Sequence, residues 1–171
     1  MKKLILLTIV GLFSLSTFAQ KMPAFSDYKV TVEKATAQKI NLTSHPLVRK
    51  FRTNLKEYLA NGELDFGGKY IAARWGCGTG CLTMALIDVT TGNVFFPKIL
   101  RDIETGYFAS NEVEKVEHRK DSRLFIIRGF PGTASPVDDT EHRNQGFWYY
   151  EWTGKRLELV KFVKKSETTN Q

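Results

Sequence analysis

Apolar residues recur at intervals of three and four between Ser44 and Gly62. This spacing puts them on one face and predicts an amphipathic helix. Ser44 is suited to cap its start, Pro46 fits the first turn, and Asn61-Gly62 provides a stop signal. We interpret the apolar face as packing against a sheet. Its members are Leu47, Val48, Phe51, Leu55, Tyr58 and Leu59.

Beyond Gly67 the pattern changes to short apolar or alternating runs between turn residues, which is typical of strands. Gly92 marks a hairpin loop, at a position that needs positive φ, and Thr153-Gly154-Lys155 marks the turn of a terminal hairpin. Alternation of Val30 and Val32 indicates a further short strand near 28–33, while 97–120 and 131–145 are predicted as connections. The strand runs are residues 69–75, 82–89, 94–96, 123–130, 146–152 and 156–163.

One helix followed by about six strands predicts an α+β fold that is mainly β, with the N-terminal helix packed on an antiparallel sheet of meandering hairpins. We expect a signal peptide over 1–19, an extended lead-in over 20–44, one domain over 45–163 and a disordered tail over 164–171.

The first 19 residues have the features of an export signal. Two lysines precede an apolar run over 4–15, and Thr17-Phe18-Ala19 offers a cleavage site. Because the run is too short to cross a bilayer, we expect a mature chain without a transmembrane segment, in the periplasm or secreted. The net charge is +7, or +5 without Lys2 and Lys3. The basic residues are scattered, so a solvated surface, or contact with anionic envelope material or an acidic protein, fits them better than nucleic acid.

Both cysteines of the chain lie in one short segment, Cys77-Gly78-Thr79-Gly80-Cys81. In an oxidising compartment these thiols are expected to form a disulfide across a tight turn. The loop-entropy model assigns about 2 kcal/mol to a five-residue ring. A redox dithiol usually has two residues between its cysteines and lies at the start of a helix, whereas this pair has three and lies between predicted strands. Two cysteines are also only half of a zinc site. No metal or cofactor is therefore predicted.

A further interpretation of this turn is an anion-binding nest. Backbone N–H groups over Gly76–Gly80 would then converge on a carboxylate or phosphate, with a basic side chain near. The candidate residues are Arg74, Trp75, Gly76, Gly78, Thr79 and Gly80.

The segment 73–81, Ala-Arg-Trp-Gly-Cys-Gly-Thr-Gly-Cys, resembles the core of an uncharacterised family of exported bacterial proteins with a Trp-Gly-Cys-Gly-Thr-x-Cys motif. The resemblance extends over about 45–163 and includes 65–70, 87–92 and 121–124. The family more often has a histidine where this chain has Lys69. The resemblance implies an exported domain and no established active site.

Two other segments are candidate sites. In the aromatic run 146–152, Trp148, Tyr150 and Trp152 share one face of the predicted strand. If one face of this strand is exposed, its aromatic side chains suit contact with a sugar or a protein. The alternative is that both faces are buried. The loop Asp138–His142 gathers carboxylates and an imidazole but matches no calcium-loop pattern.

These observations favour an exported, non-enzymatic domain that binds a protein or a polymer of the cell envelope, for example an inhibitor of an envelope-attacking hydrolase. The alternative is a periplasmic enzyme, either a thiol oxidoreductase using Cys77 and Cys81 or a hydrolase without a recognisable motif.

Overall fold

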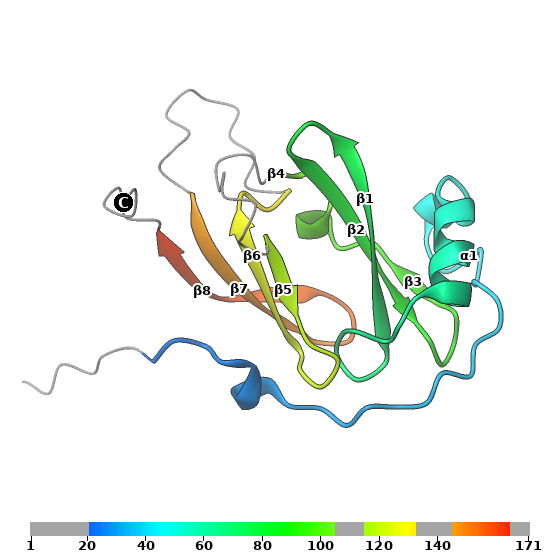
Figure 1. Cartoon of the computed structure of the whole chain (residues 1–171), viewed down its shortest axis with the longest axis horizontal. Coiled ribbons are helices and arrows are strands. Elements are labelled where there is room, and N and C mark those ends of the chain that lie inside the picture. The colour runs from blue at the N-terminus through cyan, green and yellow to red at the C-terminus, as the bar shows by residue number, and fades with distance from the viewer. Residues whose placement is uncertain (1–20, 105–114, 133–144, 165–171) are drawn as a thin grey trace, which may run out of the picture.

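The computed structural model describes residues 21–104, 115–132 and 145–164. Two antiparallel four-stranded sheets form its centre, and one α-helix packs on the first sheet (Figure 1). The predicted class, mainly β with a packed helix, is therefore confirmed. In this part of the chain no helix is both long enough and apolar enough to span a bilayer.

The first sheet is built around strand β2. β2 (Cys81–Asp88) pairs with β1 (Tyr70–Gly78) on one side and with the short strands β3 (Val94–Phe95) and β4 (Ile103–Glu104) on the other. Gly92 has a φ of 74° in the β2–β3 loop, as its sequence position predicted. β1 therefore forms one edge of this sheet.

The second sheet is a simple meander. Its strands pair in chain order: β5 (Val116–His118), β6 (Leu124–Gly129), β7 (Gly146–Trp152) and β8 (Leu157–Lys164). The predicted terminal hairpin is confirmed, with Gly154 at a φ of 88° in its turn. β5 and β8 are the edge strands. An isolated bridge between Glu104 and Phe130 connects the two sheets.

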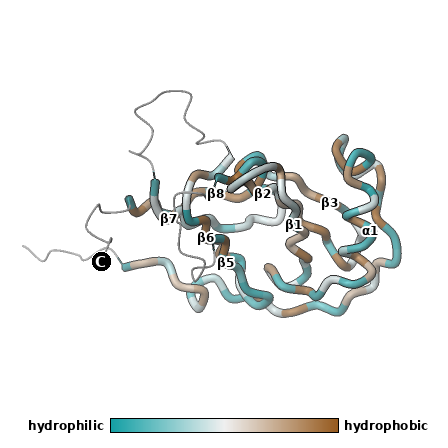
Figure 2. Tube along the Cα trace, turned by 45° about the horizontal axis from the view of Figure 1, so that its top comes forward, coloured by the Kyte–Doolittle hydropathy of each residue, from teal (hydrophilic) through white to brown (hydrophobic). Residues whose placement is uncertain are grey.

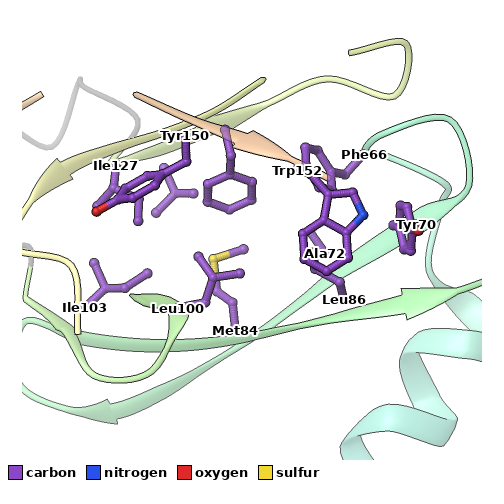
Figure 3. Packing of buried hydrophobic residues seen from close by; sticks show 12 residues of the cluster. Phe66, Tyr70, Ala72, Met84, Leu86, Leu100, Ile103, Ile127, Tyr150 and Trp152 are labelled. Carbon is purple, nitrogen blue, oxygen red and sulfur yellow. The ribbon is translucent and has the colours of Figure 1, made fainter. Parts of the chain in front are cut away.

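The side chains of β1 and β2 alternate between two hydrophobic layers. Ala72 and Leu86 face the second sheet, whereas Ile71 and Ile87 face the helix. This division explains why both strands contain continuous apolar runs, because a strand covered on two faces has no solvent side. The layer between the sheets holds the large core residues in Figure 3, including Phe66, Tyr70, Met84, Leu100, Ile127, Tyr150 and Trp152.

The predicted helix is shorter than expected. α1 spans Arg52–Asn61, and the start of the predicted segment is a separate 3-10 turn, η2 (Pro46–Val48). His45 rather than Ser44 caps that turn, since its Nδ1 accepts the Leu47 N–H at 3.1 Å. Hydrophobic and hydrophilic stretches alternate along α1 in Figure 2. The predicted apolar face does pack against the first sheet, with Val48 and Leu55 fully buried.

Gly62 ends the helix for a different reason than the sequence indicated. Its φ is −77°, so it does not adopt the left-handed conformation. Its N–H instead donates to the Tyr58 carbonyl at 2.7 Å, and a Cβ added at Gly62 would lie 2.4 Å from that oxygen. The absence of a side chain, rather than a positive φ, is what this helix end requires.

The lead-in segment contains no strand, contrary to the prediction for 28–33. It forms a 3-10 turn, η1 (Phe25–Tyr28), and a single bridge between Lys29 and Ser122. Phe25 and Tyr28 pack against Leu124, Ile126 and Tyr149 on the outer face of the second sheet. The segment is therefore part of the folded domain and covers a sheet face.

The long connection predicted over 97–120 is more structured than its sequence suggested. It includes the 3-10 turn η3 (Lys98–Leu100) as well as β4 and β5. Lys164, the first residue of the predicted disordered tail, is instead the last residue of β8. The predicted signal peptide, the rest of the predicted tail and the Asp138–His142 loop lie outside the described residues.

Candidate functional site

The two cysteines lie at the end of the β1–β2 hairpin. β1 continues through Gly78, which is opposite Cys81, so Thr79 and Gly80 alone form the loop. The predicted turn over 76–81 is thus mostly strand. Cys77 and Cys81 form a disulfide with their Cα atoms 5.1 Å apart, which confirms the predicted bond. The covalent bond closes the hairpin at the point where strand pairing ends.

The glycines around the disulfide belong to the paired hairpin. Gly76 lies opposite Leu82, and the register shifts between Gly76 and Gly78. Gly78 and Gly80 have φ values of 145° and 69°, which side-chain-bearing residues rarely adopt. Trp75 points to the helix side, where its ring centroid is 4.8 Å from that of Phe51. The glycines therefore give the hairpin its shape, while Trp75 contributes to the core.

A cavity of about 590 Å³ lies between the edge of the first sheet and the edge of the second. We call it the seam cleft. Arg74, one of the predicted ligand-binding residues, lines it from β1. Ala72 also lines it from β1. The other lining residues come from η1, α1, the segment before β1, and β5 with the residue after it: Phe25, Tyr58, Asp65, Val116, Glu117, His118 and Arg119.

A carboxylate and an imidazole pair in the seam cleft. Asp65 Oδ1 accepts the Ala72 N–H at 2.8 Å, and Asp65 Oδ2 is 3.2 Å from His118 Nε2. The imidazole stacks on Phe125 with centroids 5.4 Å apart and meets the Phe66 ring edge-on. These contacts leave 10% of the His118 side chain exposed. The pair is rigidly held because both partners have a second contact.

The acidic and basic side chains of the seam cleft differ in whether they form ion pairs. Glu117 forms an ion pair with Arg128, so both carboxylates of the cleft have partners. The Arg119 guanidinium lies 4.4 Å from the centre of the Phe25 ring, and in the part of the chain that the structure describes it has no ion pair. Arg74 adds a second guanidinium from the opposite sheet. The cleft therefore offers positive charge to an incoming group more readily than negative charge.

Two side chains already form hydrogen bonds with backbone groups at the edge of β1 in this cleft. Asp65 accepts the Ala72 N–H, and the Tyr58 hydroxyl donates to the Arg74 carbonyl at 2.6 Å. An exposed strand edge normally offers such groups to another strand. Because these two are already bonded, a ligand in the seam cleft would be recognised through side chains rather than by strand addition.

The aromatic strand β7 is covered on both faces. Tyr150 and Trp152 are buried between the sheets, and Phe147 and Tyr149 pack on the opposite side. Burial raises the pKa of Tyr150 to about 12. Trp148 is partly buried, and its Nε1–H donates to the Gly129 carbonyl at 3.0 Å. This arrangement matches the interpretation of the aromatic run as core.

The disulfide has an acidic neighbour that its sequence context did not reveal. A carboxylate oxygen of Asp102 and both sulfurs all lie within 4.8 Å of one another. Asp102 has a φ of 58°, and the Thr83 hydroxyl lies 3.4 Å from its backbone nitrogen. Both sulfurs are bonded to each other, so they are not available to a metal in this state.

Sequence reasoning missed Asp65, His118, Arg119 and Asp102. Asp65 and His118 are 53 residues apart, and no motif links them. No protein-family model, curated protein or solved structure matches the chain.

Proposed function

We propose that this protein is an exported binding domain of the cell envelope, and that the seam cleft holds carboxylate groups of an anionic envelope polymer. The proposal rests on one observation: the acidic side chains of the cleft have partners, whereas a basic side chain has no ion pair within the described part of the chain. Asp65 and Glu117 already have partners, whereas Arg119 is held over Phe25 without an ion pair among the described residues. Arginine is well suited to this role because its planar guanidinium binds carboxylates with two parallel hydrogen bonds.

Three further features support the same proposal. The disulfide suits an oxidising compartment, and the first 19 residues have the pattern of an export signal. The excess of basic over acidic residues favours anionic partners. The Asp65–His118 pair, backed by the buried ring of Phe66, gives the cleft a rigid wall, so little side-chain freedom is lost when a ligand binds.

The experiment measures co-sedimentation of the mature protein with purified peptidoglycan sacculi, whose peptides carry carboxylates, at low and at high salt. We expect binding that weakens with salt, and an apparent Kd at least about tenfold higher for Arg119→Glu, because reversal places a like charge at the ligand. Lys34→Glu makes the same change of charge at an exposed position outside the cleft and should stay within twofold of the wild type.

The result would contradict the proposal if the wild type stayed in the supernatant, or if Arg119→Glu and Lys34→Glu lowered binding equally. Equal loss would mean that overall charge, not the cleft, attracts the polymer. Turnover in a broad hydrolase screen would instead favour the enzyme alternative.

A further inference from the structure

A second cavity lies on a different part of the molecule, between the segment that follows β3 and the turn of the β7–β8 hairpin. Its volume is about 340 Å³. Phe96 and Leu157 contribute apolar wall. Three basic side chains also line it, Lys98 from η3 and Lys155 and Arg156 from the β7–β8 turn. We call it the basic cavity. It shares no lining residue with the seam cleft.

The polar side chains at the basic cavity are mostly hydrogen-bond donors. Lys98 and Lys155 are exposed and have no ion pair in the described part of the chain. Arg156 uses Nε and Nη2 to bind one oxygen of Glu158, at 2.7 and 2.6 Å. Its second terminal nitrogen, Nη1, is outside those two bonds, so the residue can still donate to a ligand.

His45 adds a further donor, as its own contacts show. Its Nδ1 accepts the Leu47 N–H at 3.1 Å, so the neutral ring carries its proton on Nε2. The ring packs against Phe96 with centroids 4.9 Å apart, which fixes its orientation at the cavity wall. Burial and the nearby positive charge of Arg101 lower the pKa of His45, so the neutral donor form is favoured.

Arg101 adds positive charge near the basic cavity without lining it. Its Nε is buried and has no hydrogen-bond partner among the residues that the structure describes. Its charge contributes to the lowered pKa of His45, whose ring does line the cavity.

We propose that the basic cavity binds the phosphate monoester of a sugar-sized ligand. Two ammonium groups, a guanidinium and the Nε2–H of His45 suit the charge and the three acceptor oxygens of a phosphate monoester. Phe96 and Leu157 offer an apolar surface to the C–H face of a sugar ring. The volume is near the lower end of the range for small-molecule sites, which fits a monosaccharide better than a polymer.

The test is isothermal titration of the mature, disulfide-bonded protein with glucose 6-phosphate at low salt. We expect saturable binding, at least tenfold weaker binding of inorganic phosphate, and no detectable binding of glucose. The double variant Lys98→Glu/Lys155→Glu should weaken glucose 6-phosphate binding at least tenfold. Circular dichroism checks that it folds, and single Lys155→Ala should give an intermediate loss. The control Lys34→Glu/Lys39→Glu, which reverses two lysines that do not line this cavity, should change affinity less than twofold.

Absence of glucose 6-phosphate binding by the wild type would overturn the proposal, as would equal losses in the two double variants. Vesicles containing phosphatidic acid present the same group on a lipid, and binding to these vesicles alone would overturn the assignment to a sugar. The outcome is independent of the seam cleft, because Arg119→Glu should leave glucose 6-phosphate binding unchanged and Lys98→Glu/Lys155→Glu should still bind sacculi.

Discussion

Asp88 is the most extensively bonded buried carboxylate of the described chain, and it fixes the end of β2. Its Oδ1 accepts the N–H and hydroxyl of Thr90 at 2.8 and 2.6 Å, and its Oδ2 is 3.2 Å from Lys69 Nζ. Burial alone would raise the pKa of Asp88, but the hydrogen bonds from Thr90 and Lys69 outweigh it and lower this pKa below 3.8. The bond to Asp88 in turn raises the pKa of Lys69.

The sign of the pH dependence follows from these directions. Because the folded state lowers the pKa of Asp88, the stabilisation is complete above pH 3.8 and is lost as pH falls through the folded value. We expect Asp88→Asn to cost about 1–3 kcal/mol of unfolding free energy at pH 7. The difference from wild type should shrink below pH 3.8, as measured by urea unfolding. A constant difference between pH 7 and pH 2 would contradict this role.

The carboxylate of Asp102 makes a separate prediction about the disulfide beside it. Both sulfurs lie within 4.8 Å of a carboxylate oxygen, so an attacking thiolate approaches a like charge. At this separation in water the repulsion is about 1 kcal/mol, or roughly a fivefold effect on rate. Asp102→Asn should therefore be reduced by glutathione several times faster at low salt, with the difference declining as salt is added.

A neutral phosphine is the matched control for Asp102, since it carries no charge to the bond. It should reduce the wild type and Asp102→Asn at similar rates. If the variant were faster with both reductants, loosened packing rather than charge would be the cause.

At the scale of elements, the lead-in connects the two sheets. The Val30 N–H donates to the backbone carbonyl of Asp121 in the β5–β6 turn, and the Glu33 N–H donates to the carbonyl of Gly68 before β1. The Ser122 hydroxyl donates to the Phe25 carbonyl at 2.9 Å. Bonds to both sheets explain why a polar segment with weak periodicity is ordered, since its backbone groups find partners there.

The lead-in should contribute stability mainly through its two aromatic residues. We expect Phe25→Ala/Tyr28→Ala to lower the unfolding free energy by about 2–4 kcal/mol, because it uncovers Leu124, Ile126 and Tyr149. Urea unfolding measures the loss, and increased binding of an apolar dye reports the uncovered face. Met22→Ala, at a side chain that is 44% exposed in the same segment, should change neither. Wild-type stability in the aromatic double variant would mean that this contact is dispensable.

Elements were predictable from the sequence where one local pattern determined them. The run Leu124–Ile127 is buried in β6, and Gly92 adopts the positive φ that its loop requires. The break between η2 and α1 was missed because both parts contribute to one apolar face, so helical spacing continues across it. The Asp65–His118 pair could not be predicted, because Asp65 lies beside the first sheet and His118 in the second, and the two meet only where the edges of these sheets lie side by side.

The whole molecule is a stack of layers in which each sheet depends on its neighbour. α1 covers one face of the first sheet, the second sheet covers the other, and η1 covers the outer face of the second sheet (Figure 1). Removing either sheet would uncover the central cluster, because that cluster takes side chains from both. Interdependent layers favour a single cooperative transition.

The tryptophans allow this cooperativity to be tested. Trp75 reports on the layer between the helix and the first sheet, whereas Trp148 and Trp152 report on the layer between the sheets. We expect the urea transitions of fluorescence and far-UV circular dichroism to coincide in the wild type. They should also coincide in Trp75→Phe, whose fluorescence comes from the second sheet alone. Non-coincident transitions in Trp75→Phe would mean that the second sheet unfolds separately, and that the lead-in and the shared core do not join the two sheets into one folding unit.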